Sequence, residues 1–79
     1  MTLKIISPSE TVFEGTTKMV TLPGAMGSFT VLRNHASLIA ALTAGTIVSR
    51  DADSENSRSF EIKGGIADVD NNVISVCIY

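Results

Sequence analysis

The sequence predicts an all-β protein: a small flattened β-sandwich or barrel of short, mostly antiparallel strands. Apolar and polar residues alternate with the two-residue period of strands along most of the chain. Turn-forming residues interrupt this alternation about every eight to twelve positions, a spacing typical of all-β sandwiches. No long stretch carries the 3.6-residue period of an amphipathic helix together with capping residues.

The expected strands are runs of β-branched and aromatic residues bounded by turn signals. Pro8 ends the first run and Pro23 ends the third, while Gly15 is expected to form a turn or bulge between the second and third. The run 36–42 is too short for its period to decide between a helical turn and a strand. The expected strands cover residues 3–6, 11–14, 18–22, 29–32, 46–50, 60–63, 66–69 and 73–79.

Residues 51–57 are the most polar stretch, and we expect a solvated hairpin loop there. Their acidic side chains raise the alternative of a calcium loop. The stretch lacks the central glycine and the terminal glutamate of the calcium-binding pattern, which favours the plain hairpin. A tighter turn is expected at 70–72. Close backbone approach or simple turns are expected at four glycines: Gly24, Gly45, Gly64 and Gly65.

The composition indicates a folded chain with many apolar residues for its size. Apolar residues make up 44% of the 79 residues and charged residues 18%, against ~25% charged residues in typical soluble domains. A chain this short hides only ~60% of the surface that its unfolded form exposes. Composition leaves two interpretations open: a monomer with a dense core, or a domain whose exposed apolar surface is covered by a partner.

Charge and hydropathy exclude several classes of function. A net charge of −2, a single Tyr and no Trp leave neither a basic stripe nor a stacking platform for nucleic acid. The longest apolar run, 38–42, is far shorter than the ~20 residues of a membrane helix. No signal-peptide region fits before Ser7 and Pro8. We therefore expect a soluble intracellular protein with at most an indirect link to a membrane.

No residue pattern predicts catalysis. His35, the only histidine, has no nucleophile motif beside it. Cys77 lies in an apolar strand, where we expect a buried, unreactive thiol. As the single cysteine it forms no disulfide within the chain, and with His35 it makes no metal-ligand cluster. The segment 24–27 lacks the lysine and the helix of a phosphate loop. We expect no catalytic residue, no metal site and no cofactor.

The order of motifs from Pro23 to Val76 resembles that of the epsilon subunit of F-type ATP synthases. A glycine-rich turn leads through a short strand to a His-Ala-x-Leu segment, and then to a Leu-x-x-Gly before the next strand. The opening Ser-Pro with a following Val-Phe-x-Gly, and the closing pair of strands, also match. The resemblance covers nearly the whole chain, through residues 7–8, 12–15, 24–28, 35–38, 42–45, 64–69 and 73–76.

Four residues depart from the family's pattern. Thr30 stands where glycine is usual, Arg33 and Ser37 where proline is usual, and Asp68 where glutamate is frequent. The first three change the stiffness expected of the loop region 26–37. Longer family members continue into a two-helix hairpin that inhibits ATP hydrolysis. We expect one epsilon-type β-sandwich domain over 1–79 and no C-terminal helical domain.

The resemblance implies a non-catalytic central-stalk subunit of the rotor of a proton-translocating ATP synthase. Such a subunit couples the gamma subunit to the polar loops of the membrane ring of c subunits during rotary ATP synthesis. It lies peripherally at the cytoplasmic face of the bacterial inner membrane and binds no cofactor. Two alternatives remain: a free-standing β-sandwich that binds a peptide or small ligand, and a small hydrolase that uses His35.

The resemblance also implies which residues meet each partner. The loop that faces the c-ring consists of Met26, Gly27, Ser28 and Phe29, with Arg33 close by. The residues that face gamma are Ser7, His35, Leu38 and Ala40.

Overall fold

The computed structural model describes residues 1–79 and confirms the all-β prediction. It contains no helix, and so none that is long and apolar enough to cross a membrane. Its eight strands are β1 (Thr2–Ile6), β2 (Thr11–Leu22), β3 (Phe29–Leu32), β4 (Leu38–Leu42), β5 (Gly45–Asp51), β6 (Ser57–Ile62), β7 (Gly65–Asp70) and β8 (Val73–Ile78).

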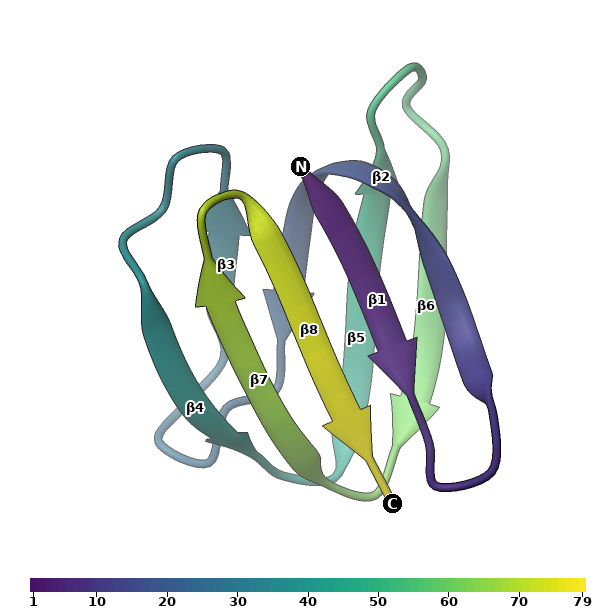
Figure 1. Ribbon diagram of the computed structural model, residues 1–79, viewed down its shortest axis with the longest axis vertical. Coiled ribbons are helices and arrows are strands. Elements are labelled where there is room, and N and C mark those ends of the chain that lie inside the picture. The colour runs from purple at the N-terminus through teal and green to yellow at the C-terminus, as the bar shows by residue number, and fades with distance from the viewer.

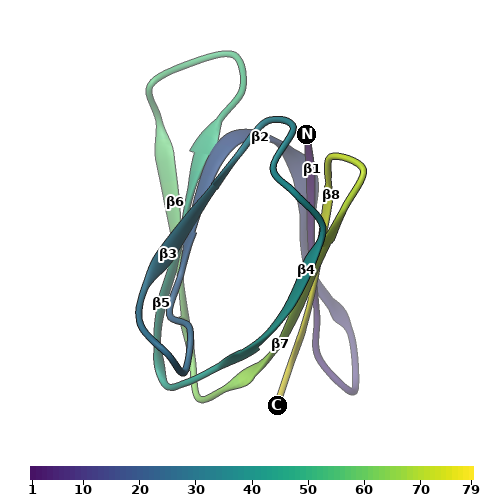
Figure 2. The ribbon, with the colours of Figure 1, turned by 90° about the vertical axis from the view of Figure 1, so that its left-hand side faces the viewer.

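The strands form two layers that share the long strand β2 (Figure 2). The front sheet, which faces the viewer in Figure 1, has the order β4-β7-β8-β1 and ends on the first half of β2. The back sheet contains the second half of β2 with β3 on one side, and β5 followed by β6 on the other. All neighbours are antiparallel except β1 and β8, which are parallel. Both ends of the chain therefore lie in adjacent strands of one sheet.

Strand β2 crosses between the layers at Thr17. Residues up to Thr16 pair with β1, and pairing with β5 begins at Thr17, where a bulge precedes Met19. The Thr17 side chain is fully buried, and its hydroxyl donates to the Arg50 carbonyl at 2.7 Å. The buried Ser49 hydroxyl in turn donates to Thr17 Oγ1 at 2.9 Å. These bonds satisfy the polar groups that the change of layer buries.

The core fills the space between the two sheets. Strand β7 illustrates how the strands supply this core. Its residues alternate strictly between buried and exposed, so every second side chain faces inward. The remaining strands that line the core follow the same period over shorter stretches. The twelve buried apolar residues are Leu3, Ile5, Val20, Leu22, Val31, Leu42, Ile47, Ile62, Ala67, Val69, Ile74 and Val76.

Aromatic packing and one bridge close the two open sides of the sandwich. On one side the rings of Phe13 and Phe60 lie 5.2 Å apart, and the Arg58 guanidinium lies 5.4 Å from the centre of the Phe13 ring. On the other side Gly24 forms an antiparallel bridge with Leu42. The edges of the two sheets are thereby joined, which gives the sandwich its partly closed, barrel-like outline.

The prediction of a turn or bulge at Gly15 is wrong, because β2 runs straight through this residue. Gly15 pairs with Leu3 of β1. A Cβ atom at this position would lie 2.9 Å from the Phe13 ring, so the missing side chain makes room for that aromatic group. The undecided run 36–42 forms a strand, β4, and the polar stretch 51–57 connects β5 to β6.

The prediction that Cys77 is buried is also wrong, since its side chain is exposed. The expected alternation in β8 is correct, and Ile74 and Val76 face the core. Both faces of this strand carry apolar residues, and Val73 is exposed on the same face as Cys77. The two-residue period identifies two faces but does not say which one meets the opposite sheet.

The four glycines expected at turns lie at or beside strand ends. Gly24 accepts a hydrogen bond from the Gly27 N–H at 3.0 Å, and Gly45 is the first residue of β5. Gly64 precedes β7 and Gly65 begins it. A Cβ atom on Gly65 would collide with the Cys77 carbonyl of β8, so the close approach of these two strands requires glycine there.

Replacing Thr17 by valine is expected to destabilise the protein by about 1–3 kcal/mol, because the Arg50 carbonyl and the Ser49 hydroxyl would lose their buried partner. Urea unfolding followed by circular dichroism measures this change. Thr16→Val, at the exposed neighbouring position, is the control and should stay within about 0.5 kcal/mol of wild type. Equal stability of the two variants would show that the hydroxyl network does not stabilise the crossing.

Candidate interaction surface

The outer face of the front sheet carries a row of apolar side chains across four strands. Strand register places Ala41 opposite Ile66, Ile66 opposite Cys77, and Cys77 opposite Ile6. Paired side chains on one face of a sheet are neighbours, with Cβ atoms ~5 Å apart. Ile39 lies two positions before Ala41 on the same face, and 75% of its surface is exposed. We call these five residues the apolar row.

Polar residues border the apolar row on the same face. The next register row begins with Ile39 of β4, which pairs with Asp68, and continues through Ser75, Lys4 and Glu14 across β8, β1 and β2. Lys4 makes no ion pair within the chain. An apolar centre with a polar margin is the usual composition of a protein–protein interface. Of the two interpretations that composition left open, the structure supports the one with exposed apolar surface.

Two of the residues expected to face gamma lie at diagonally opposite corners of this face. Ser7 follows β1 at the end where Ile6 pairs with Cys77, and His35 precedes β4 at the end where Leu38 pairs with Val69. Strands β7 and β8 separate β1 from β4 (Figure 1). The apolar row follows the end of the sheet that carries Ser7, and Ile39 extends it along β4 toward the end that carries His35.

The other two expected gamma-facing residues point toward the interior. Leu38 and Ala40 are half-buried and alternate with Ile39 and Ala41, which are exposed. Sequence reasoning missed the exposed pair, and it missed Ile66 and Ile6 as well. The sequence of β7 did indicate that Ile66 is exposed, because Ile66 alternates in phase with the charged residues Asp68 and Asp70 and therefore lies on the same face.

The expected c-ring loop lies at one end of the sandwich. Met26, Gly27 and Ser28 are exposed, and Met26 is exposed completely. No charged residue occurs between Pro23 and Thr30. The loop and β4 together enclose an apolar hollow of about 250 Å³, lined by Gly24, Ala25, Met26, Gly27, Phe29, Ile39, Ala40 and Ala41.

The structure keeps Phe29 beside this loop, where it lines the same hollow, but it does not bring Arg33 there. Phe29 is the first residue of β3, is half-buried and packs against the core. Arg33 follows β3 at its far end, whereas the Met26–Ser28 loop precedes the strand (Figure 1). The expected single contact region is therefore corrected to two, because a complete strand separates them.

His35 shows no catalytic arrangement. It is half-buried, and its Nδ1 atom lies 2.7 Å from the carbonyl oxygen of the adjacent Ala36. This is the only hydrogen bond of the ring, so neither a hydroxyl nucleophile nor an orienting carboxylate is bonded to it. Because a general base needs such partners, the geometry gives no support to the hydrolase alternative.

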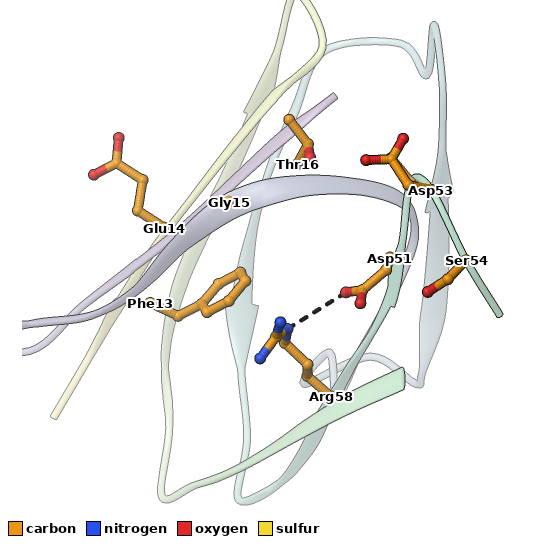
Figure 3. Close-up of a pocket in the computed structure, with 9 residues that line it drawn as sticks. Phe13, Glu14, Gly15, Thr16, Asp51, Asp53, Ser54 and Arg58 are labelled. Atoms are coloured by element: carbon orange, nitrogen blue, oxygen red, sulfur yellow. Dashed lines mark hydrogen bonds and ion pairs between the residues drawn. The ribbon is translucent and has the colours of Figure 1, made fainter. Parts of the chain in front are cut away.

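A polar hollow of about 300 Å³ lies between β2 and the hairpin that joins β5 to β6 (Figure 3). Arg58 points toward Asp51, with Nε 3.4 Å from Oδ1, and lies beneath the Phe13 ring. Asp53 and Ser54 border the hollow from the hairpin, while Glu14 points away from it. The one basic group is thus paired within the protein. The arrangement closes the side of the sandwich and brings no reactive pair together.

The same hairpin is held over β2 by Glu55. Its two carboxylate oxygens lie 2.7 Å from Lys18 Nζ and 3.4 Å from Arg50 Nη1. The hydrogen bond from Lys18, followed by the charges of Lys18 and Arg50, lowers the pKa of the Glu55 carboxyl. No group of three metal-ligating side chains forms here or elsewhere in the structure. Residues 51–57 thus belong to the hairpin that joins the paired strands β5 and β6.

Lys18→Met is expected to raise the pKa of the Glu55 carboxyl toward its ordinary value, because Lys18 makes the closest bond to it. A pH titration of the Glu55 side-chain carbon by NMR measures this shift. Since the folded-state pKa is lowered, the contact favours folding at neutral pH and is lost as the pH falls through that pKa. Lys63→Met is the control, and an equal effect of both variants would contradict the assignment.

Comparison with known proteins identifies the relatives of this chain. The sequence profile of the family "ATP synthase, Delta/Epsilon chain, beta-sandwich domain" matches residues 1–78. The ATP synthase epsilon chain of Rickettsia typhi is 42% identical over 77 residues, which are 94% of this chain and 68% of the relative. That of Campylobacter jejuni subsp. doylei is 43% identical over 76 residues, 96% of this chain and 58% of the relative.

Solved structures share the fold. One chain in a Euglena gracilis mitochondrial ATP synthase assembly of OSCP, F1 and c-ring superimposes with a TM-score of 0.88 at 19% identity, covering 96% of this chain and 48% of that chain. One chain in the central stalk and c-ring assembly of the Tetrahymena thermophila mitochondrial ATP synthase superimposes with a TM-score of 0.82 at 15% identity. The match covers 98% of this chain and 61% of that chain. The chain thus spans about half to two thirds of the length of these relatives.

Proposed function

Because the chain belongs to the delta/epsilon-chain β-sandwich family of ATP synthases, we propose that it couples the gamma subunit to the c-ring in the rotor of a proton-translocating ATP synthase. The family is a non-catalytic subunit of that complex. In this role the domain transmits torque during ATP synthesis and needs rigid contacts on two sides. It requires no reactive group and no cofactor.

The apolar row is the observation that carries the proposal. Five outward apolar side chains on one sheet are more than a solvated β-sandwich face needs, since such a face is ordinarily polar. The protein measures 29 × 24 × 18 Å along its principal axes. Its broad face therefore offers an area on the order of the ~800 Å² per partner that a standard interface buries. In the proposed assembly, gamma covers this face.

The Met26–Ser28 loop is the second proposed contact. It lies at the end of β4 near Leu42, where Gly24 bridges to the front sheet. One edge of the sandwich thus brings the apolar row and the loop close together through Ile39 and Ala41. Contact of the loop with the polar loops of the c-ring would give the domain its only link to the membrane. The proposed location is the cytoplasmic face of the bacterial inner membrane.

Ile66→Asp is expected to weaken binding to the purified cognate gamma subunit by at least about tenfold, equal to ~1.4 kcal/mol, because it places a charge within a desolvated contact. Isothermal titration calorimetry of the variant into gamma measures this effect. Leu32→Asp is a closely matched control, since Leu32 is 53% exposed and Ile66 is 54% exposed.

Leu32 lies on the outer face of the back sheet, where it pairs with Met19. Its replacement should leave the affinity for gamma within about twofold of wild type, as for a residue outside an interface. Loss of binding in the Leu32 variant alone would assign gamma to the back sheet. No binding by the wild-type chain would favour the free-standing binding module.

Cysteine cross-linking tests the two regions that the structure separates. In a Cys77→Ala background, Met26→Cys labelled with a photo-activated cross-linker is expected to yield an adduct with subunit c in the assembled complex. Arg33→Cys should yield none, since it lies beyond the far end of β3. Equal yields of c adducts at both positions would contradict the proposed orientation.

A further inference from the structure

Three asparagines with left-handed backbones gather at the end of the sandwich that carries His35. Asn34, Asn71 and Asn72 have φ values of 64°, 50° and 62°, and no other residue except glycine has a positive φ. Asn71 and Asn72 form the two-residue turn between β7 and β8, where such values are usual. Asn34 is the third residue of a β-turn between β3 and β4, closed by the His35 N–H donating to the Leu32 carbonyl at 3.1 Å, and asparagine tolerates a positive φ at this position.

The side chains of Asn34 and Asn72 bond this loop to the turn in both directions. The backbone N–H of Asn34 donates to Oδ1 of Asn72 at 2.7 Å. The amide Nδ2 of Asn72 donates to Oδ1 of Asn34 at 3.0 Å. The backbone carbonyl of Asn72 also accepts the N–H of Thr2 at 3.0 Å. Asn72 thus joins the start of β1, its own hairpin and the loop before β4.

A third bond holds the far end of the same loop. The Ser37 hydroxyl donates to Oδ1 of Asp70 at 2.6 Å, and Asp70 immediately precedes the asparagine turn. Between the two attachments lies His35, and Arg33 precedes the first. Arg33 is exposed and forms no ion pair within the chain. The loop is therefore fixed at both ends by bonds that involve neither the Arg33 nor the His35 side chain. The His35 ring bonds only the adjacent Ala36 carbonyl, and Arg33 lines a separate hollow with Met1, Lys18 and Ala52.

We propose that the reciprocal Asn34–Asn72 amide pair is a positioning device that presents His35 to the partner covering the front sheet. This inference rests on the proposed gamma contact. It assigns a supporting role in that contact to Asn34 and Asn72, which do not touch gamma themselves. A left-handed non-glycine residue has a conformational cost, and such residues persist where the surrounding bonds determine them. A loop that is ordered before binding loses less entropy on association, which raises affinity.

The test compares Asn72→Gly with Asn71→Gly. Glycine retains the left-handed conformation at both positions, but only Asn72 loses hydrogen bonds, because no bond of the Asn71 side chain is present. Amide hydrogen exchange, measured by NMR without any partner, should accelerate for Asn34 and His35 in Asn72→Gly and remain unchanged in Asn71→Gly. Thermal unfolding confirms that both variants are folded.

Affinity for gamma is the readout that a purely structural bond would not change. Asn72→Gly is expected to weaken gamma binding roughly three- to tenfold, because the loop would then have to be ordered on association, whereas Asn71→Gly should bind like wild type. The double variant Asn34→Gly/Asn72→Gly should bind no more weakly than the weaker single variant, because both remove the same pair.

Two results would overturn the inference and are distinguishable from failure of the proposed function. Faster exchange in Asn72→Gly with wild-type affinity would show that the pair orders the loop without serving docking. Unchanged exchange would show that it does not order the loop. If wild-type protein itself fails to bind gamma, the proposed contact is refuted, and the positioning role falls with it.

Discussion

The structure depends on one strand that belongs to both sheets. β2 leaves the front sheet and enters the back sheet at Thr17, and this crossing buries a hydroxyl and the backbone groups around it. A buried polar group is tolerated only when it is bonded, and Ser49 and Arg50 of β5 supply the bonds. The crossing therefore fixes where β5 lies relative to β1. Strand β8 then pairs with β1 and β6 with β5, while β3 pairs with β2 itself.

This construction suits the proposed role of transmitting force between gamma and the c-ring. The two layers are covalently continuous through β2, and their open sides are closed by Phe13 with Phe60 and by the bridge from Gly24 to Leu42. A small domain has little core with which to resist deformation. Linking its layers at a corner and at both edges supplies stiffness that the core alone would not.

The candidate site follows from the same constraints. The front sheet places four strands side by side with their apolar residues in register, so that single exposed residues far apart in the chain become one row. The loop ends are ordered separately, by side-chain bonds between asparagines and between Ser37 and Asp70. The proposed function rests on this shaped surface, and the His35 ring bonds only the adjacent Ala36 carbonyl.

The sequence by itself determined the all-β class, most strand positions and the family. These properties are local: Pro8 and Pro23 interrupt strands whatever surrounds them, and the motif order does not depend on packing. Only the tertiary structure decided that Gly15 lies inside a strand and that Cys77 is exposed. Each of these depends on which face of a strand meets the other sheet, or on an aromatic ring reaching across a glycine. Alternation in one strand cannot specify either, because the period of two is the same for both faces.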